Sequence, residues 1–299
     1  MAPTAPGKAE RNNLRKLLEI ARDEDLGPGD VTGALLPRGA AARGRFVARQ
    51  ELVVAGGALL EEIVSAYDPA TTVEPKAPEG ARVAGGEVLA ECSGPARAIL
   101  AAERVALNFL QRLSGVGTLT RRFVEAVAGT EAVISDTRKT TPGWRALEKY
   151  AVRCGGGCNH RMGLYDAVLI KDNHLAMLAA ADPRMTIAGL GDRLVEARVR
   201  LGSGGVIEIE VDTLDQLAEA LTLPVDVVLL DNMDPPELRR AVATRDEAGR
   251  RDEVALEASG GVTLETVRAV AETGVDRIAV GALTHSAPAA DIALEMELQ

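Results

Sequence analysis

Short apolar runs and helical periodicities alternate along the chain from about residue 130 to its end. Six runs have the length and the aliphatic composition of buried strands, at 132–135, 167–170, 206–211, 226–230, 254–256 and 277–280. Helical segments separate most of these runs, near 145–152, 193–201, 214–221, 236–244 and 264–272. Repeated strand–helix units are typical of a parallel sheet, either open or closed into a barrel.

The residues before position 130 follow a different pattern. One helix face is formed by Leu14, Leu17, Leu18 and Ala21. Residues 43–92 contain strand-like pieces separated by turns, and a long helical stretch covers 96–128. We expect that helix to break near Gly115 and Gly117, because glycine weakens a helix interior. We expect residues 1–13 to form a disordered leader.

Polar residues or glycines stand directly after all six strand-like runs. They are found at 136–139, 171–174, 210–212, 231–232, 257–261 and 281. The carboxyl ends of parallel strands meet at one edge of a sheet, where α/β barrels and open α/β sheets place their active sites. Helix capping explains any one of these strand ends, but the full set predicts a functional site.

The chain carries 34 Lys and Arg against 44 Asp and Glu, a formal net charge of −10, so we expect neither nucleic acid nor membrane as a partner. The N-terminus lacks the pattern of a signal peptide, and no apolar run approaches the ~18 residues of a membrane span. Three cysteines are too few for a disulfide framework. We therefore expect a soluble, cytoplasmic protein.

The acidic average conceals a basic segment. Residues 134–174 hold seven Lys and Arg against four Asp and Glu, before His160 and His174 are counted. A local positive field on an acidic protein suggests a small anionic ligand. Arg138, Lys139 and Lys171 directly follow apolar strands, where side chains face the end of the sheet. A solvated helix face explains Arg145, Lys149 and Arg153.

Cys154, Cys158 and His160 lie close together in the sequence and raise the question of a metal. A structural zinc site needs four ligands, and only three are local. The cysteines are more typical of small packing residues.

Glu208 and Glu210 alternate with aliphatic residues, so both carboxylates lie on one face of a strand. Both faces of a parallel sheet are normally covered, and buried carboxylates need cations. Together with Asp231 they form an acidic cluster suited to Mg²⁺, which takes carboxylate and phosphate oxygens. A salt-bridge network with Lys139 and Lys171, without a metal, explains the same residues equally well.

The run Ser259-Gly260-Gly261 precedes a helix, and its glycines let backbone N–H groups approach an anion at a helix N-terminus. Gly281 ends the next strand and is soon followed by His285. Paired phosphate loops after the last two strands recur in barrels. The residues alone therefore predict an enzyme that acts on a small phosphate-bearing substrate.

The motifs together match a known pattern from about residue 12 to the end. The matching stretches are 24–32, 103–108, 136–143, 149–157, 159–161, 169–174, 208–212, 229–232, 257–261 and 279–285. In order and composition they closely resemble the quinolinate phosphoribosyltransferases, or carboxylating nicotinate-nucleotide pyrophosphorylases.

This resemblance implies an N-terminal α/β sandwich domain over 1–112 and an incomplete, TIM-like α/β barrel over 113–285. The tail 286–299 is then expected to pack back onto the first domain. The implied enzyme is a type II phosphoribosyltransferase of de novo NAD biosynthesis. It joins quinolinate to phosphoribosyl pyrophosphate with Mg²⁺, giving nicotinate mononucleotide, pyrophosphate and CO₂. The resemblance also implies a homodimer, or a larger assembly of dimers, with shared active sites.

The resemblance assigns roles to individual residues. Quinolinate binding falls to Thr137, Arg138, His160, Arg161 and Lys171, together with Arg104 of the partner subunit. Phosphoribosyl pyrophosphate binding falls to Lys139, Ser259, Gly260, Gly261, Gly281, Ala282 and His285. The catalytic group is Lys139, Lys171, Glu210 and Asp231, of which Glu210 and Asp231 also serve the metal.

Two places depart from the family pattern. Segment 179–205 is longer than usual, so we expect an extended surface helix or loop. Ala258 stands where a serine is common, which predicts a weaker phosphate contact.

Two other functions fit parts of the sequence. One is a paralogous phosphoribosyltransferase of the same fold that acts on nicotinate or another base. The other is a non-catalytic sensor of phosphosugars or nucleotides. The cations at Arg138, Arg161 and Lys171 favour a dicarboxylate over a monocarboxylate. The presence of Lys139, Glu210 and Asp231 together favours an enzyme over a sensor.

Overall fold

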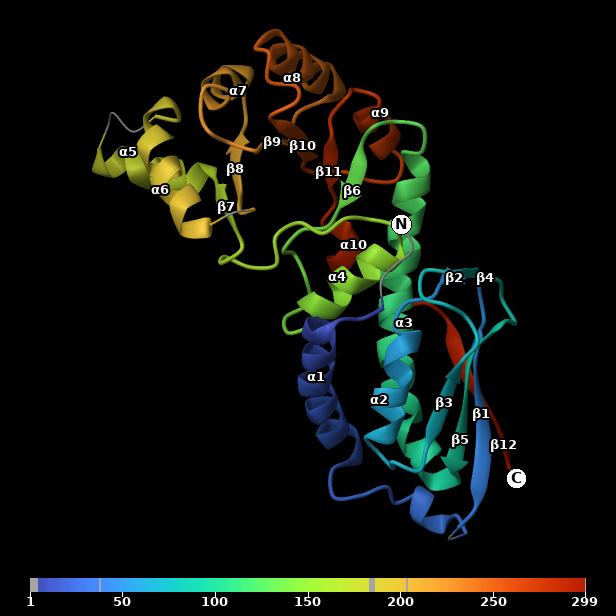
Figure 1. Cartoon of the computed structure of the whole chain (residues 1–299). Coiled ribbons are helices and arrows are strands. Elements are labelled where there is room, and N and C mark those ends of the chain that lie inside the picture. Colours follow the sequence, from blue (N-terminus) through green and yellow to red (C-terminus); the bar gives the residue numbers. More distant parts are fainter. Residues whose placement is uncertain (1–4, 38, 183–185, 203, 299) are drawn as a thin grey trace. The chain divides into compact units, whose positions relative to one another are not determined.

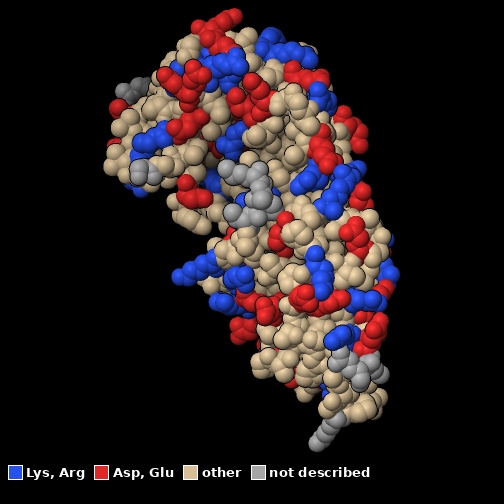
Figure 2. All heavy atoms as spheres, turned by 45° about the vertical axis from the view of Figure 1, so that its right-hand side comes forward, with Lys and Arg blue, Asp and Glu red and all other residues tan. Residues whose placement is uncertain are grey.

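A computed structural model describes residues 5–37, 39–182, 186–202 and 204–298, and the chain divides into two compact units (Figure 1). The first unit comprises Met1–Arg122, Lys139–Gly157 and Ala282–Gln299. The second comprises Phe123–Arg138 and Cys158–Gly281. The domain boundaries expected from the sequence stay a prediction. Basic and acidic side chains are interspersed on the face drawn in Figure 2.

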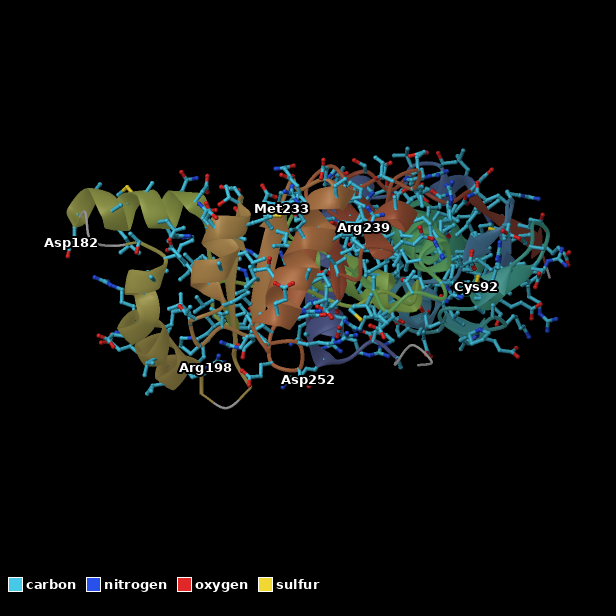
Figure 3. The ribbon with its side chains drawn as sticks, turned by 90° about the horizontal axis from the view of Figure 1, so that it is seen from above. Cys92, Asp182, Arg198, Met233, Arg239 and Asp252 are labelled. Carbon is cyan, nitrogen blue, oxygen red and sulfur yellow. The ribbon has the colours of Figure 1, made fainter. Side chains whose placement is uncertain are left out.

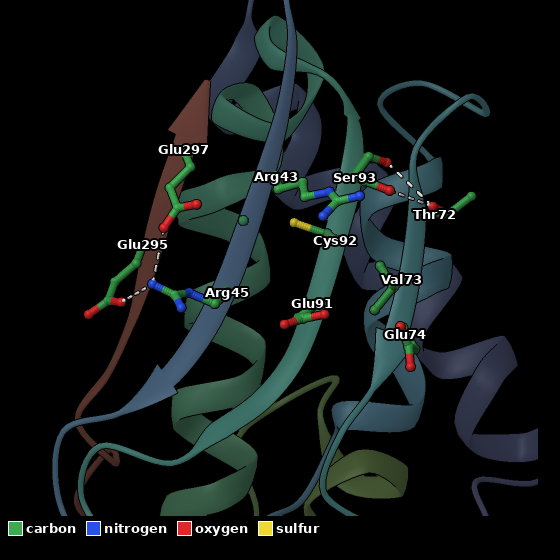
Figure 4. A pocket seen from close by; sticks show the side chains of 11 residues that line it. Arg43, Arg45, Thr72, Val73, Glu74, Glu91, Cys92, Ser93, Glu295 and Glu297 are labelled. Carbon is green, nitrogen blue, oxygen red and sulfur yellow. Dashed lines mark hydrogen bonds and ion pairs between the residues drawn. The ribbon is translucent and has the colours of Figure 1, made fainter. Parts of the chain in front are cut away.

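The first unit is built on an antiparallel sheet with the strand order β12-β1-β5-β3. Its strands are β1 (Ala41–Ala48), β3 (Thr72–Pro75), β5 (Val88–Pro95) and β12 (Ile292–Leu298), beside a small pair, β2 (Leu52–Val53) and β4 (Arg82–Val83). The C-terminal strand therefore pairs with β1. The outward face of the sheet is charged: Arg45 lies between Glu295 and Glu297, at 3.4 and 3.3 Å (Figure 4).

The helices of this unit are α1 (Lys8–Leu26), α2 (Leu60–Ser65), most of α3 (Ala96–Ala126), α4 (Arg145–Cys154) and α10 (Ala282–His285), with short 3-10 helices η1 (Gly33–Leu35) and η2 (Gly57–Leu59).

The predicted face of α1 is confirmed, since Leu14 and Leu18 are buried. The disordered leader is wrong from Lys8 onward, and residues 1–4 lie outside the described residues. The helix begins there because Glu10 accepts the N–H of Gly7 at 3.0 Å and pairs with Arg153 at 2.7 Å.

Helix α3 runs without interruption through Gly115 and Gly117, so the predicted break is wrong. A Cβ atom at Gly115 would overlap the carbonyl oxygen of Pro288, whereas one at Gly117 would make an ordinary contact, 3.4 Å from that of Ala151. Gly115 therefore admits neighbouring backbone against the helix. Close packing outweighs the roughly 1 kcal/mol that glycine costs in a helix interior.

The second unit is a six-stranded parallel sheet with the order β6-β11-β10-β9-β8-β7, as the sequence pattern predicts. Its strands are β6 (Val133–Ser135), β7 (Ala167–Ile170), β8 (Val206–Val211), β9 (Val227–Asp231), β10 (Ala255–Ser259) and β11 (Arg277–Ala279). Its helices are α5 (Asp172–Ala181), η3 (Ala188–Leu190), α6 (Gly191–Leu201), α7 (Leu214–Ala220), α8 (Pro235–Glu247) and α9 (Val267–Ala271). The predicted α/β class is confirmed.

Within segment 179–205, which includes undescribed residues 183–185 and 203, the chain forms the end of α5, then η3 and α6. None of the helices in the described ranges is both long and apolar enough to cross a membrane.

The strand register gives this sheet two chemically different faces. One face carries only aliphatic side chains, among them Ile209, Leu230, Leu256 and Ile278, all of them fully buried. The opposite, polar face carries Glu208, Glu210, Asp231, Glu257, Ser259, Arg277 and Ser135 in aligned positions. Burial of the aliphatic face under helices stabilises the sheet, which leaves the polar face for chemistry.

Two Asp–Arg pairs reinforce the amino ends of the strands, opposite the polar carboxyl ends. Asp226 and Asp276 each precede a strand and accept a backbone N–H of the strand before it, both at 2.7 Å. Asp226 binds Arg198 of α6 (labelled in Figure 3) at 2.7 Å, and Asp276 binds Arg245 of α8 at 2.5 Å. The two pairs differ in burial, because the Arg245 side chain is 2% exposed and that of Arg198 is 37% exposed.

We expect Asp276→Ala to lower the free energy of unfolding by about 3 kcal/mol, because it leaves a buried guanidinium with Asp246 as its remaining ionic partner. The matched variant Asp226→Ala should cost about 1 kcal/mol, since Arg198 is open to water. Urea denaturation of both variants measures the difference. Equal losses would contradict the importance of burial at this pair.

Candidate active site

Buried carboxylates dominate the polar face of the second unit, and each has a cation beside it. Lys171, directly after β7, binds Glu210 of β8. His160 Nε2 lies 2.9 Å from Glu208 Oε2 and 3.4 Å from Glu257 Oε1. The Nε of Arg277, on β11, lies 3.0 Å from Glu257 Oε2. Of the network expected from the sequence, the structure contains the Lys171 pair, whereas Glu208 pairs with a histidine.

A buried aspartate, Asp136, holds His160 over the sheet. Its Oδ1 accepts the backbone N–H of His160 at 2.8 Å, and its Oδ2 accepts the side-chain amide of Asn159 at 2.6 Å. The strand-like bridge between Ser135 and Cys158 places the loop beside β6. Asp136 therefore fixes the segment that delivers His160 and Arg161.

Both ring nitrogens of His160 are engaged inside the protein. In the neutral ring Nδ1 accepts the backbone N–H of Arg161 at 2.7 Å, while Nε2 faces the two glutamates. Burial disfavours the charged ring, but the hydrogen bond and charge of Glu208, with the charge of Glu257, outweigh burial and raise the pKa of His160. In this arrangement His160 supports the backbone of Arg161, and its direct contact with quinolinate stays a prediction.

Burial and the charge of Glu208 raise the pKa of Glu257 to about 7, against the opposing charges of His160 and Arg277. The side chain is fully buried. This carboxyl group therefore titrates close to neutral pH.

Two half-buried arginines, Arg138 and Arg161, provide the cations expected for an anionic ligand. Burial, followed by the charge of Arg138, lowers the pKa of Arg161. The Nε atoms of both arginines are buried and have no hydrogen-bond acceptor within the described part of the chain. Because buried donors are normally paired, these groups suit an anion that brings its own acceptors.

The ends of β9 and β10 interlock at the same edge. Asn232 follows Asp231 in the left-handed region, with φ 55°, and its side-chain amide donates to Asp231 at 2.7 Å. A Cβ atom at Gly260 would overlap the Asn232 side chain, and Gly260 itself has φ 100°. Ser259 aligns with Asp231 on the polar face, whereas Ala258 is buried on the aliphatic face and points away from the site.

The remaining predicted residues belong partly to the second unit and partly to the first. Thr137 and Gly281 are half-buried. Lys139 and His285 are exposed, and Ala282 begins α10. Arg104 is exposed on α3, where it lines a cavity of about 240 Å³ beside the stacked rings of Phe109 and Trp144.

The cysteines do not join a metal-binding cluster among the described residues. Cys154 is buried and contacts Glu79 at 3.5 Å, and Cys158 is exposed. Within that part of the chain, the group with ligand atoms close enough for one ion is His160, Glu208 and Glu257. Its charges are already matched by His160 and Arg277, so it is a salt-bridge network.

Sequence reasoning assigned no role to four residues of this site: Asp136, Asn232 and Glu257, which stand in the predicted strand-end segments, and Arg277, which lies within a predicted strand. Glu257 and Ser259 are two residues apart, as Glu208 and Glu210 are. This spacing is a signal that the two residues of each pair lie on one face of their strand. The pairing of Glu257 with Arg277 depends on strand order, which periodicity does not specify.

Comparison with known proteins decides the family. Residues 30–114 match the family described as quinolinate phosphoribosyl transferase, N-terminal domain, and residues 116–295 match its C-terminal domain. The chain belongs to the quinolinate phosphoribosyltransferase family. The family predicted from the motifs is thus confirmed, as is the prediction that the chain is an enzyme of this kind.

Similar members of the quinolinate phosphoribosyltransferase family come from several bacteria. A probable nicotinate-nucleotide pyrophosphorylase [carboxylating] of Bacillus subtilis (strain 168) is 41% identical over 285 residues, covering 95% of this chain and 94% of that protein. The nicotinate-nucleotide pyrophosphorylase [carboxylating] of Mycobacterium leprae (strain TN) is 41% identical over 297 residues, covering 96% of this chain and 97% of that protein. The solved structure of the nicotinate-nucleotide pyrophosphorylase from Francisella tularensis is 34% identical, has a TM-score of 0.86 and covers 100% of both chains.

The raised pKa values of Glu257 and His160 predict a stability that falls as pH rises. Both groups favour the protonated form when folded. The contribution of Glu257 is complete near pH 4 and is lost as pH rises through about 7, and that of His160 is complete below its unfolded pKa and is lost above its raised folded pKa. Between about pH 5 and pH 8 we expect a loss on the order of 2 kcal/mol, and Glu257→Gln should remove most of it.

Denaturation at a series of pH values measures this dependence. The control Glu19→Gln, on the exposed side of α1, should keep the wild-type profile. A Glu257→Gln variant with the same profile as the wild type would show that the buried cluster does not carry the effect.

Proposed function

We propose that the chain transfers the phosphoribosyl group of phosphoribosyl pyrophosphate to quinolinate and releases CO₂, giving nicotinate mononucleotide and pyrophosphate. This reaction belongs to de novo NAD biosynthesis. One observation supports it above the others: Arg138 and Arg161 lie close enough to affect each other electrostatically, and both Nε–H groups are buried without acceptors among the described residues.

Quinolinate carries two neighbouring carboxylates on one ring. Arginine binds carboxylates through a fixed fork of N–H donors, so two arginines match two carboxylates. A dicarboxylate also relieves the repulsion between Arg138 and Arg161. Lys171 adds a third cation, and Thr137, half-buried beside Arg138, provides a hydroxyl.

Bond formation joins the ring nitrogen of quinolinate to C1′ of the ribose, while the bond from C1′ to pyrophosphate breaks. Positive charge builds on the ribose during this exchange. The carboxylates of Glu210 and Asp231, at neighbouring strand ends on the polar face, stabilise such a charge. Asn232 holds the Asp231 carboxylate in place.

The phosphates are assigned to strand ends and to the segments that follow them. Ser259, Gly260 and Gly261 suit the 5′-phosphate, because glycine exposes backbone N–H groups. Gly281, Ala282 and His285 are assigned to the same phosphate. Lys139, which follows Arg138 directly in the sequence, is assigned to the pyrophosphate.

Mg²⁺ fits the oxygen donors of Glu210 and Asp231. One oxygen of each carboxylate binds a neighbouring side chain, and the other has no partner in the described part of the chain. Mg²⁺ is typically held by one or two carboxylates together with substrate phosphates. When bound, it neutralises the charge of the leaving pyrophosphate.

Decarboxylation follows from the bond formed in the first step. The ring nitrogen becomes cationic once it is attached to ribose, and it accepts the electron pair left at C2 when CO₂ departs. A proton then takes the vacated position. The reaction therefore needs no prosthetic group.

We propose a cytoplasmic homodimer in which Arg104 of the partner subunit completes the quinolinate site. Arg104 is exposed on α3, and no ion pair to it is present among the described residues. This leaves its guanidinium available to a ligand bound by another copy of the chain.

Turnover tests the proposed function directly. Purified protein is supplied with quinolinate, phosphoribosyl pyrophosphate and Mg²⁺, and CO₂ and nicotinate mononucleotide are followed. We expect both products in equal amounts. Turnover with nicotinate alone would indicate the paralogous enzyme, and thermal stabilisation by substrates without turnover would indicate a sensor.

Arg161→Ala should raise the KM for quinolinate about 100-fold and change that for phosphoribosyl pyrophosphate by less than about threefold, because it removes one carboxylate fork. The control Arg239→Ala, on the exposed surface of α8, should change neither value. Steady-state kinetics with each substrate varied in turn provide the test. Equal effects on both substrates would rule out the assigned role.

Subunit complementation tests the shared site. Arg104→Ala and Lys139→Ala homodimers should each be nearly inactive. Mixed dimers should recover about a quarter to a half of the wild-type activity per dimer, because one of their two sites then lacks both defects. Mixed dimers, verified by mass spectrometry, that stay inactive would show that Arg104 does not act across the interface.

A further inference from the structure

Arg112 of α3 joins three segments of the first unit that are distant in the sequence. Its Nε and Nη2 donate to Glu148 Oε1 of α4, at 3.1 and 2.6 Å. Its Nη1 donates to the carbonyl of Ala287 at 2.9 Å, and its Nη2 also donates to the carbonyl of Thr284. One guanidinium therefore binds α4 and the segment after β11 together.

Glu148 extends this connection to the loop that follows Arg138. The Glu148 side chain is fully buried. Its Oε2 accepts the N–H of Thr141 at 2.9 Å, and its Oε1 accepts the Thr141 hydroxyl at 2.8 Å. A buried carboxylate with this many donors holds the loop backbone in a single position.

A direct hydrogen bond closes the connection. The Thr284 hydroxyl donates to the carbonyl of Lys139 at 2.8 Å, and Thr284 is fully buried. The two segments joined in this way carry Lys139 on one side, and Ala282 and His285 on the other. These are the residues assigned above to the pyrophosphate and the 5′-phosphate.

We propose that Arg112 and Glu148 are a positioning pair for phosphoribosyl pyrophosphate: they hold the backbone of Lys139 at a set distance from that of His285. The inference rests on the proposed function. Neither residue needs to touch the substrate. Both phosphate-binding side chains are exposed, so the pair acts on their backbones, which the buried hydrogen bonds hold in place before the substrate binds. Fixing them lowers the entropy lost when a substrate with a phosphate at each end binds.

The experiment uses two variants of graded severity. Arg112→Lys keeps the charge but cannot reach Glu148 and both carbonyls at once. Thr284→Val keeps the shape of a buried side chain and removes the hydrogen bond to Lys139. We expect Arg112→Lys to raise the KM for phosphoribosyl pyrophosphate about tenfold and Thr284→Val to raise it about threefold, with the KM for quinolinate changed by less than about twofold in both.

Arg245→Lys is the matched control, because Arg245, like Arg112, binds a carboxylate and a backbone carbonyl, and its side chain is the more buried of the two. It should lower the melting temperature while leaving both KM values within about twofold. The same result for Arg112→Lys, or equal changes in both KM values, would overturn the proposal. If Arg112→Lys fails to fold, Thr284→Val decides the question by the same criterion. Failure of the proposed function is recognised separately, since the wild type would then make no nicotinate mononucleotide.

Discussion

The need to neutralise buried carboxylates on one face of a parallel sheet organises the second unit. Glu208 and Glu257 are almost completely buried, and Glu210 is largely so. An ionised carboxylate in such surroundings is tolerated only beside a cation. The cations come from a loop, a strand end and a strand: His160, Lys171 and Arg277. Through this requirement the loop of His160 is held over the sheet, and Arg161 is placed with it.

The same arrangement leaves positive charge at the edge of the sheet. His160 and Arg277 pair with the interior glutamates, and no ion pair of Arg138 or Arg161 with an acidic side chain is present in the described part of the chain. The two guanidinium groups repel each other in these partly buried surroundings, and binding of an anion relieves the repulsion. The buried glutamates of the sheet and the arginines at its edge therefore belong to one arrangement of charges. The net charge of −10 conceals this arrangement.

The sequence pattern predicted the six strands of the second unit because aliphatic runs bounded by polar residues are local signals. The strand-end site followed from them, and family motifs supplied the roles. The start of α1 was missed because it depends on Glu10 meeting Arg153, far along the chain. The continuity of α3 was missed because helix propensity alone predicts a break at Gly115. Glycine is present at this position because the backbone packed against the helix leaves no room for a side chain. Glu257 lay in a predicted strand-end segment but received no role, because its partners lie on another strand and on a loop, and periodicity identifies a face but no neighbours.

Asn232 and Gly260 occupy adjoining space at the carboxyl ends of β9 and β10, and this has an evolutionary consequence. Any side chain at position 260 would displace the amide that orients Asp231. A smaller residue at 232 would not make room for that side chain, because Gly260 has φ 100° and a Cβ atom there would still come 2.9 Å from the backbone nitrogen of residue 232. Glycine is therefore expected at 260 in relatives whatever residue stands at 232. Relatives that have changed 232 alone are the ones in which the aspartate before it loses its side-chain donor.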